Sequence, residues 1–135
     1  MFLFTIDPMS RCPVYEQIIK QLERFVLTGV LKPGSQLPSV RSLSAELGIN
    51  PNTIQKAYSE LDTRGVVCTV PGKGGFISQN ATALLYEYKL QKLSELRDMV
   101  NEMALAGIAE EDLLCLIQEV YSHKETPRKG RNPDD

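Results

Sequence analysis

Between Asn50 and Lys56 the chain carries a run of side chains that can bind the edges of DNA bases. Asn and Gln can form paired hydrogen bonds with adenine, Thr can contact a base or a phosphate, and Lys can bind guanine or a phosphate. The residues of this run that we consider are Asn50, Pro51, Asn52, Thr53, Gln55 and Lys56. A plain solvated helix face is the alternative interpretation. Acidic residues first appear beyond the run, at Glu60 and Asp62.

Two cations outside this run can also contact DNA. Arg41 lies in the preceding predicted helix, where it can bind a phosphate or a base. The alternative is an intrahelical ion pair with Glu46 or another surface charge. Lys73 lies between glycines at the tip of a predicted hairpin, where Gly74 would let the backbone approach DNA closely. The alternative for Lys73 is a lysine that only keeps the hairpin tip soluble.

Three predicted helices position these residues. Apolar residues recur every three or four positions over 14–28, 39–47 and 51–64, which is typical of amphipathic helices. Ser39 and Asn50 suit the N-cap position, Pro51 suits the first helical position, and Gly48 ends the second helix. A short helix, a tight turn and another helix have the spacing of a helix-turn-helix, whose second helix presents its N-terminal residues to the major groove.

A hairpin is predicted directly after these helices, over residues 66–78. VVCTV is β-branched and apolar, PGKGG is a turn, and FIS returns. We therefore predict a mostly α fold with a winged helix-turn-helix domain over residues 1–79, made of three helices plus a β-hairpin wing. The last residues, 124–135, read KETPRKGRNPDD and include no apolar residue, so this tail is predicted to be disordered.

Residues 80–123 are predicted to form two helices, one from Ala81 to Leu105 and one beginning at Glu110. A two-helix hairpin encloses little interior, so its apolar faces need a partner, either the DNA-binding domain or the same helices of a second chain. We favour the second chain and expect a dimerisation part here. The residues expected at its interface are Leu93, Leu96, Val100, Met103, Leu113, Ile117 and Val120.

The charges are divided unevenly between these parts. The whole chain carries −2, but residues 1–79 hold eight basic and six acidic side chains, whereas residues 80–123 hold three basic and eight acidic ones. This asymmetry favours a near-neutral to basic half that binds DNA and an acidic half that avoids it.

Composition argues against other classes of protein. The three cysteines, Cys12, Cys68 and Cys115, lie far apart and the chain has one histidine, so we expect no metal site and no cofactor. GKGG closes a hairpin instead of preceding a helix, so it is no phosphate-binding loop, and we expect no enzyme. No apolar run reaches the ~20 residues of a membrane span and no basic leader is present, so we expect a cytoplasmic protein without a membrane partner.

The stretch from Gly29 to Ile77 resembles the GntR family of bacterial regulators. The positions that carry the resemblance are Gly29, Leu31, Pro33, Gly34, Leu37, Pro38, Ser39, Arg41, Leu43, Leu47, Thr53, Ala57, Leu61, Gly65, Gly72, Gly74, Phe76 and Ile77. So many matches at fixed spacing are highly specific. The opening IDPMSRCPVYEQI and the short helical C-terminal part look like the YtrA subfamily.

The resemblance implies a transcription regulator, expected to be a repressor, that acts as a homodimer on an inverted-repeat operator. Its half-sites would lie about one helical turn apart, ~34 Å. The resemblance also implies DNA contacts by Ser39, by Arg41, by the run defined above, and by Lys73 with Gly74. Whether a small-molecule effector binds is left open. The alternative function is a winged-helix protein-interaction module without specific DNA binding.

The chain departs from the family pattern at a few positions. Ser44 stands where alanine is usual, and Gly75 replaces the usual threonine. Val70 and Pro71 stand where the family often has arginine and a polar residue. This loss of charge lowers the share of the DNA affinity that we expect from the wing.

Overall fold

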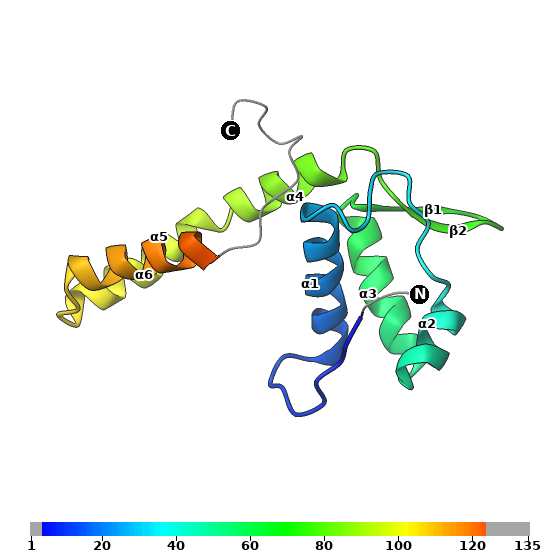
Figure 1. The fold of residues 1–135 in the computed structure, drawn as a ribbon, viewed down its shortest axis with the longest axis horizontal. Coiled ribbons are helices and arrows are strands. Elements are labelled where there is room, and N and C mark those ends of the chain that lie inside the picture. Colours follow the sequence, from blue (N-terminus) through cyan, green and yellow to red (C-terminus); the bar gives the residue numbers. More distant parts are fainter. Residues whose placement is uncertain (1–3, 124–135) are drawn as a thin grey trace. The chain divides into compact units, whose positions relative to one another are not determined.

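The computed structural model describes residues 4–123 and has the predicted mostly α architecture with a winged helix-turn-helix (Figure 1). The elements of this part of the chain are α1 (Val14–Leu27), α2 (Val40–Leu47), α3 (Pro51–Thr63), β1 (Val67–Val70), β2 (Gly74–Ile77), α4 (Ala81–Leu90), α5 (Leu93–Leu105) and α6 (Glu110–His123). The described residues divide into two compact units, with the division between Leu85 and Tyr86.

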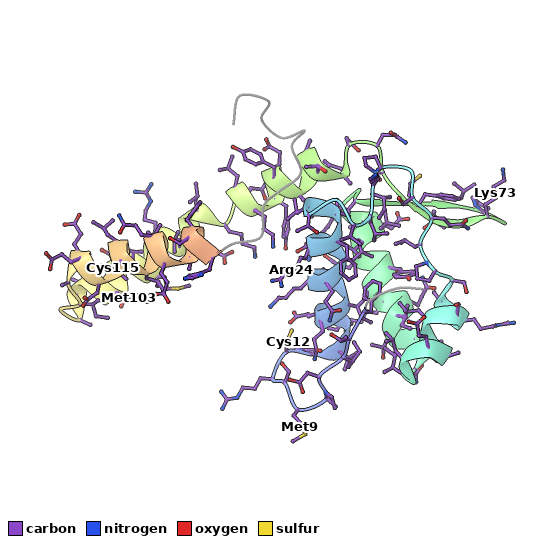
Figure 2. The ribbon with its side chains drawn as sticks, viewed as in Figure 1. Met9, Cys12, Arg24, Lys73, Met103 and Cys115 are labelled. Carbon is purple, nitrogen blue, oxygen red and sulfur yellow. The ribbon has the colours of Figure 1, made fainter. Side chains whose placement is uncertain are left out.

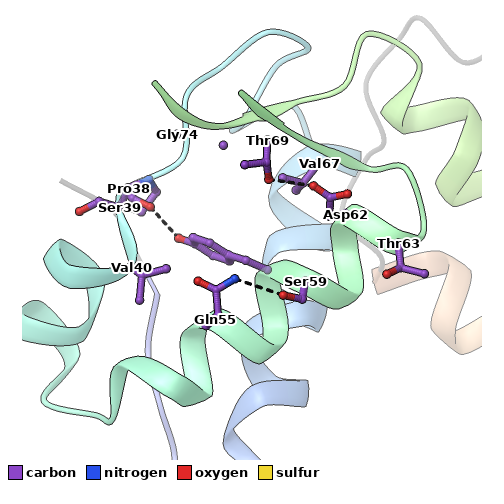
Figure 3. Close-up of a pocket in the computed structure, with 12 residues that line it drawn as sticks. Pro38, Ser39, Val40, Gln55, Ser59, Asp62, Thr63, Val67, Thr69 and Gly74 are labelled. Atoms are coloured by element: carbon purple, nitrogen blue, oxygen red, sulfur yellow. Dashed lines mark hydrogen bonds between the residues drawn. The ribbon is translucent and has the colours of Figure 1, made fainter. Parts of the chain in front are cut away.

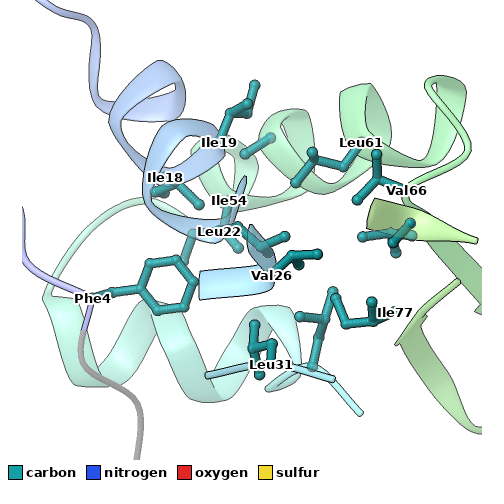
Figure 4. Packing of buried hydrophobic residues seen from close by; sticks show 14 of the residues in the cluster. Phe4, Ile18, Ile19, Leu22, Val26, Leu31, Ile54, Leu61, Val66 and Ile77 are labelled. Atoms are coloured by element: carbon teal, nitrogen blue, oxygen red, sulfur yellow. The ribbon is translucent and has the colours of Figure 1, made fainter. Parts of the chain in front are cut away.

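The core of the first unit joins α1, α2 and α3, and α3 packs against both other helices (Figure 4). Ile18 and Leu22 of α1 and Ile54 and Leu61 of α3 are fully buried there. Burial of each such side chain contributes roughly 1.5–3 kcal/mol, so this packing fixes α3 on α1. The other buried apolar residues are Phe4, Ile19, Val26, Leu31, Leu37, Leu43, Ala57, Val66, Val67, Ile77, Ala81 and Leu85.

Local hydrogen bonds set the ends of α2 and α3, which confirms the predicted caps. The Oγ of Ser39 accepts a hydrogen bond from the backbone N–H of Ser42 at 3.0 Å. The Oδ1 of Asn50 accepts one from the N–H of Asn52 at 2.8 Å, and Pro51 is the first residue of α3. Gly48 closes α2 with a φ of +69°, a left-handed conformation that glycine adopts without steric cost.

The predicted hairpin is confirmed as an antiparallel pair whose register runs from Val67 opposite Ile77 to Val70 opposite Gly74. Gly74 belongs to β2 and not to the turn, where the sequence placed it. Residues 34–37 lie along the other edge of β2. The N–H of Gly34 donates to the carbonyl of Ile77 at 2.7 Å, and the N–H of Leu37 donates to the carbonyl of Gly75 at 2.8 Å.

The C-terminal part differs from its prediction in the number of helices. The single helix expected over 81–105 is interrupted at Gln91 and Lys92, so α4, α5 and α6 replace the two predicted helices. At the interruption the N–H of Lys92 donates to the carbonyl of Lys89 at 2.9 Å, a tighter i to i−3 bond. The interruption was not predicted because neither residue is a glycine or a proline.

The boundary between the two parts also lies later than predicted, after residue 85 and not after residue 79. Ala81 and Leu85 are buried in the core of the first unit, which assigns the first turns of α4 to that unit. The tail at 124–135, predicted to be disordered, lies outside the described residues.

Candidate nucleic-acid interface

A groove of about 460 Å³ lies between α3 and the wing (Figure 3). From α3 it is lined by Gln55, Ser59 and Thr63. Ser39 at the start of α2 and Thr69 of β1 line it from the other elements. Amide and hydroxyl groups from three elements therefore face one groove.

One carboxylate lies in this groove, at the C-terminal half of α3. The Oδ2 of Asp62 accepts a hydrogen bond from the Oγ1 of Thr69 at 2.8 Å, which joins α3 to β1 (Figure 3). The other acid of this half, Glu60, is bound by Arg64, whose Nε lies 3.0 Å from its Oε2. Because negative charge repels phosphate, the N-terminal half of α3 is the half suited to approach DNA.

The N-terminal end of α3 is open. Asn50, Pro51 and Asn52 are exposed and Thr53 is half-buried, whereas Ile54 points into the core. Pro51 has no backbone N–H, the N–H of Asn52 is bound by the Oδ1 of Asn50, and the N–H of Thr53 donates to the carbonyl of Asn50 at 3.0 Å. This end therefore offers DNA its side-chain donors together with the positive end of the helix dipole.

Besides the cap formed by Asn50, two side chains of the predicted run make contacts within the chain. The Nε2 of Gln55 donates to the Oγ of Ser59 at 3.1 Å. The Nζ of Lys56 lies 4.0 Å from the centre of the Tyr15 ring, so its charge is held against α1 by a cation–π interaction. Such an exposed contact is worth about 0.5–1 kcal/mol, which is the order of cost for Lys56 to turn toward DNA.

The remaining predicted residues are exposed. Arg41 lies on the surface of α2 and, within residues 4–123, makes no ion pair with Glu46. Lys73 lies exposed at the end of the hairpin (Figure 2), next to the exposed Gly74.

Two contacts brace the helix-turn-helix that were not predicted from the sequence. The Oγ of Ser44 donates to the carbonyl of Ile49 at 2.5 Å, across the turn between α2 and α3. The hydroxyl of Tyr58 donates to the carbonyl of Pro38 at 2.9 Å, which ties α3 to the start of α2. Burial raises the pKa of Tyr58 well above its ordinary value, because the charged phenolate would lack water. The signal in the sequence for the first of these contacts was Ser44 itself, which stands where the family pattern usually has alanine.

A buried ion pair anchors the other end of α3. The Nη1 of Arg64, just after the last residue of α3, lies 2.8 Å from the Oε2 of Glu23 in α1. Glu23 is only 4% exposed. The pair therefore holds the C-terminal end of the candidate recognition helix against α1.

The residues predicted for dimerisation lie mostly exposed on α5 and α6. Neither helix has a buried residue. Leu93, Leu96, Val100, Ile117 and Val120 are exposed, between 38% and 56% of their surface. The other two predicted residues, Met103 and Leu113, are half-buried. Two amphipathic helices thus leave their apolar faces uncovered within a single chain.

The described residues do not contain a group of three His, Cys, Asp or Glu side chains that could hold a metal ion. None of the helices in this part of the chain has both the length and the apolar character needed to cross a membrane.

Comparison with known proteins agrees with this domain. The family model described as bacterial regulatory proteins, gntR family, matches residues 14–77. The HTH-type transcriptional repressor YtrA of Bacillus subtilis (strain 168) is 42% identical over 129 residues, which are 95% of this chain and 99% of that repressor. This similarity agrees with the subfamily expected from the sequence, and the relative is named as a regulator and not as an enzyme.

Two solved structures share the architecture. A protein titled as a transcriptional antiterminator from Listeria monocytogenes EGD-e has a TM-score of 0.71 and 34% identity, and the match covers 90% of this chain and 91% of that one. YtrA from Sulfolobus acidocaldarius, a GntR-family transcription factor, has a TM-score of 0.61 and 31% identity, over 78% of this chain and 100% of its own. The chain described here therefore belongs to the GntR family of bacterial regulatory proteins, and α1–α3 with the hairpin form its winged-helix DNA-binding domain.

Proposed function

We propose that the protein is a sequence-specific repressor that binds an inverted-repeat operator as a homodimer in the bacterial cytoplasm. The observation that carries this proposal is the exposed N-terminal end of α3, with Asn50 and Asn52 on its surface. The groove shared with the wing begins further along α3, at Gln55. A helix end of this kind fits the major groove, where its side chains reach base edges.

Each predicted contact has a separate role in this proposal. Asn52 and Thr53 lie in the first turn of α3 and would bind base edges. Arg41 on α2 and Lys73 on the wing would bind phosphates on either side of that helix and so set its register. Lys56 would join them only after leaving the ring of Tyr15.

The dimer is supported by the uncovered faces of α5 and α6. Contiguous apolar surface on a soluble chain marks an interaction site, and here it continues over two helices without a buried residue. The acidic character of residues 80–123 disfavours DNA as the partner of this surface. A second copy of the same helices would bury it, and a two-fold dimer matches an inverted repeat.

DNA binding can be tested by fluorescence anisotropy with duplexes from the upstream region of the protein's own gene, in competition with random DNA. Affinity should fall as salt rises, because phosphate contacts release counterions. Thr53→Ala should cost about 1–3 kcal/mol if its hydroxyl makes a specific base contact, whereas Arg41→Ala should weaken binding to every duplex alike and reduce the salt dependence, because its guanidinium contacts phosphate. Lys20→Ala removes an exposed cation of α1 and is the matched control that should bind like the wild type. Equal competition by random DNA would refute sequence-specific binding and leave the protein-interaction module.

The dimer can be tested by sedimentation velocity on two neighbouring variants. Val100→Asp places a charge on the apolar face of α5, where it should convert dimers to monomers. Asn101→Asp adds the same charge to the next position, which is polar and exposed, and should leave the dimer intact. If Val100→Asp remains dimeric, this face of α5 is not the interface.

A further inference from the structure

The tip of the wing is held by a side chain from outside the hairpin. Gln36, in the segment that runs along β2, donates a hydrogen bond from its Nε2 to the carbonyl oxygen of Lys73 at 2.8 Å. Its backbone forms a bridge with Phe76. A Cβ added to Gly74 would lie 3.5 Å from the same Nε2, so the glutamine amide lies directly against the backbone at Gly74.

The turn itself fixes the other side of Lys73. The N–H of Lys73 donates to the carbonyl of Val70 at 2.9 Å, with Pro71 and Gly72 between them. Gly72 has a φ of +80°, so proline followed by this glycine fits the two central positions of a type II turn. Both backbone polar groups of Lys73 are therefore bound, while its side chain is exposed.

The charge that this arrangement positions is unique in the wing. Lys73 is the only charged residue in the sequence from Val67 to Ile77. The backbone bonds between residues 34–37 and β2 reach Gly75 and do not extend to the turn. Among the described residues, Gln36 supplies the only side-chain hydrogen bond to residues 71–73. A hairpin with strands of four residues has little stability of its own, so its tip depends on such a tether.

We propose that Gln36 is a positioning residue for DNA binding, which holds the wing tip so that the ammonium of Lys73 meets the DNA. The proposal rests on the proposed function, since it assigns how the wing of that DNA-binding domain takes part. Gln36 acts through the carbonyl of Lys73 and need not contact the DNA itself.

The first experiment measures the wing of the free protein. Gln36→Met keeps the length of the side chain and removes the donor. The ¹⁵N order parameters of Lys73 and Gly74 should fall from about 0.85, typical of rigid backbone, toward 0.6. Gln79→Met is the matched control, because Gln79 is another exposed glutamine whose amide lies near Gly34, away from the tip. Unchanged order at Lys73 and Gly74 in Gln36→Met would overturn the proposal.

The second experiment measures operator affinity against salt for the wild type, Gln36→Met, Lys73→Ala and the double variant. Lys73→Ala should make the plot of log affinity against log salt less steep by about 1. Gln36→Met should also make this plot less steep, and Gln36→Met should have no further effect on it once Lys73 is alanine. A loss of affinity that is the same with and without Lys73 would overturn the proposal. If the wild type does not prefer its operator, the proposed function fails, and the order parameters still decide the role of Gln36.

Discussion

Replacement of Arg64 by alanine tests how strongly α3 is anchored to α1. Arg64 binds two carboxylates, with Nη1 2.8 Å from Glu23 and Nε 3.0 Å from Glu60. The two partners differ in burial, since the side chain of Glu23 is 5% exposed and that of Glu60 is 44% exposed. The buried carboxylate therefore decides the energetic result.

Removal of one partner of a buried ion pair costs about 3–5 kcal/mol, because the other charge stays in a medium of low polarity. The Arg64 side chain is itself 19% exposed, so water can reach the vacated space and we expect the lower limit, about 3 kcal/mol. The exposed bond to Glu60, four residues earlier, adds only ~0.3–0.5 kcal/mol. Glu23→Gln removes the charge and keeps the shape, so it should cost less, about 1–2 kcal/mol.

The assay is urea unfolding followed by circular dichroism, with Arg11→Ala as the control for loss of an exposed arginine. Arg64→Ala in the Glu23→Gln background should cost clearly less than in the wild type, since no buried charge is left behind. A cost of Arg64→Ala below about 1 kcal/mol, or costs that simply add in the double variant, would refute the reasoning that this pair anchors α3.

Substitutions at three further positions test the bracing of the helix-turn-helix by the same unfolding assay. Tyr58→Phe removes the bond to the carbonyl of Pro38 and should cost about 1 kcal/mol. Burial raises the pKa of Tyr58, so on raising the pH this tyrosine ionises in the unfolded chain before it ionises in the folded one. The contribution of Tyr58 to stability is therefore complete below pH ~10, the pKa of a free tyrosine, and is lost as the pH rises further. Tyr58→Phe should accordingly lose less stability than the wild type at alkaline pH. Ser39→Ala removes the N-cap of α2 and should cost about 1 kcal/mol, and Ser39→Gly only a few tenths. Ser44→Ala should cost about 1 kcal/mol because the carbonyl of Ile49 loses its donor; an unchanged urea midpoint would show that water replaces the serine.

The helix-turn-helix was predictable from the sequence because its signals are local. Ser39, Gly48, Asn50 and Pro51 each set a helix end through their own side chain or backbone, so their positions predicted the ends that the structure shows. The interruption at Gln91 was not predictable, since it depends on a change of hydrogen-bond partner between residues that all favour helices.

The candidate interface was predictable only in part. Exposure of the N-terminal end of α3 follows from the spacing of its buried residues. The contact of Lys56 with Tyr15 and the bond from Gln36 to Lys73 join residues far apart in the sequence. Such contacts depend on how the elements pack in space, and no periodicity or cap in the sequence reports them.

The segment at residues 34–37 also protects the wing from unwanted pairing between molecules. A hairpin at the surface normally offers two open rows of backbone donors and acceptors, which other chains can extend into a larger sheet. Here one of these rows, along β2, is already satisfied by Gly34, Ser35 and Leu37. Among the described residues, the row along the outer edge of β1 is the one left open, and a strand of four residues is a short template for another chain. Molecules crowded on neighbouring stretches of a chromosome would thus have little means of aggregating through their wings.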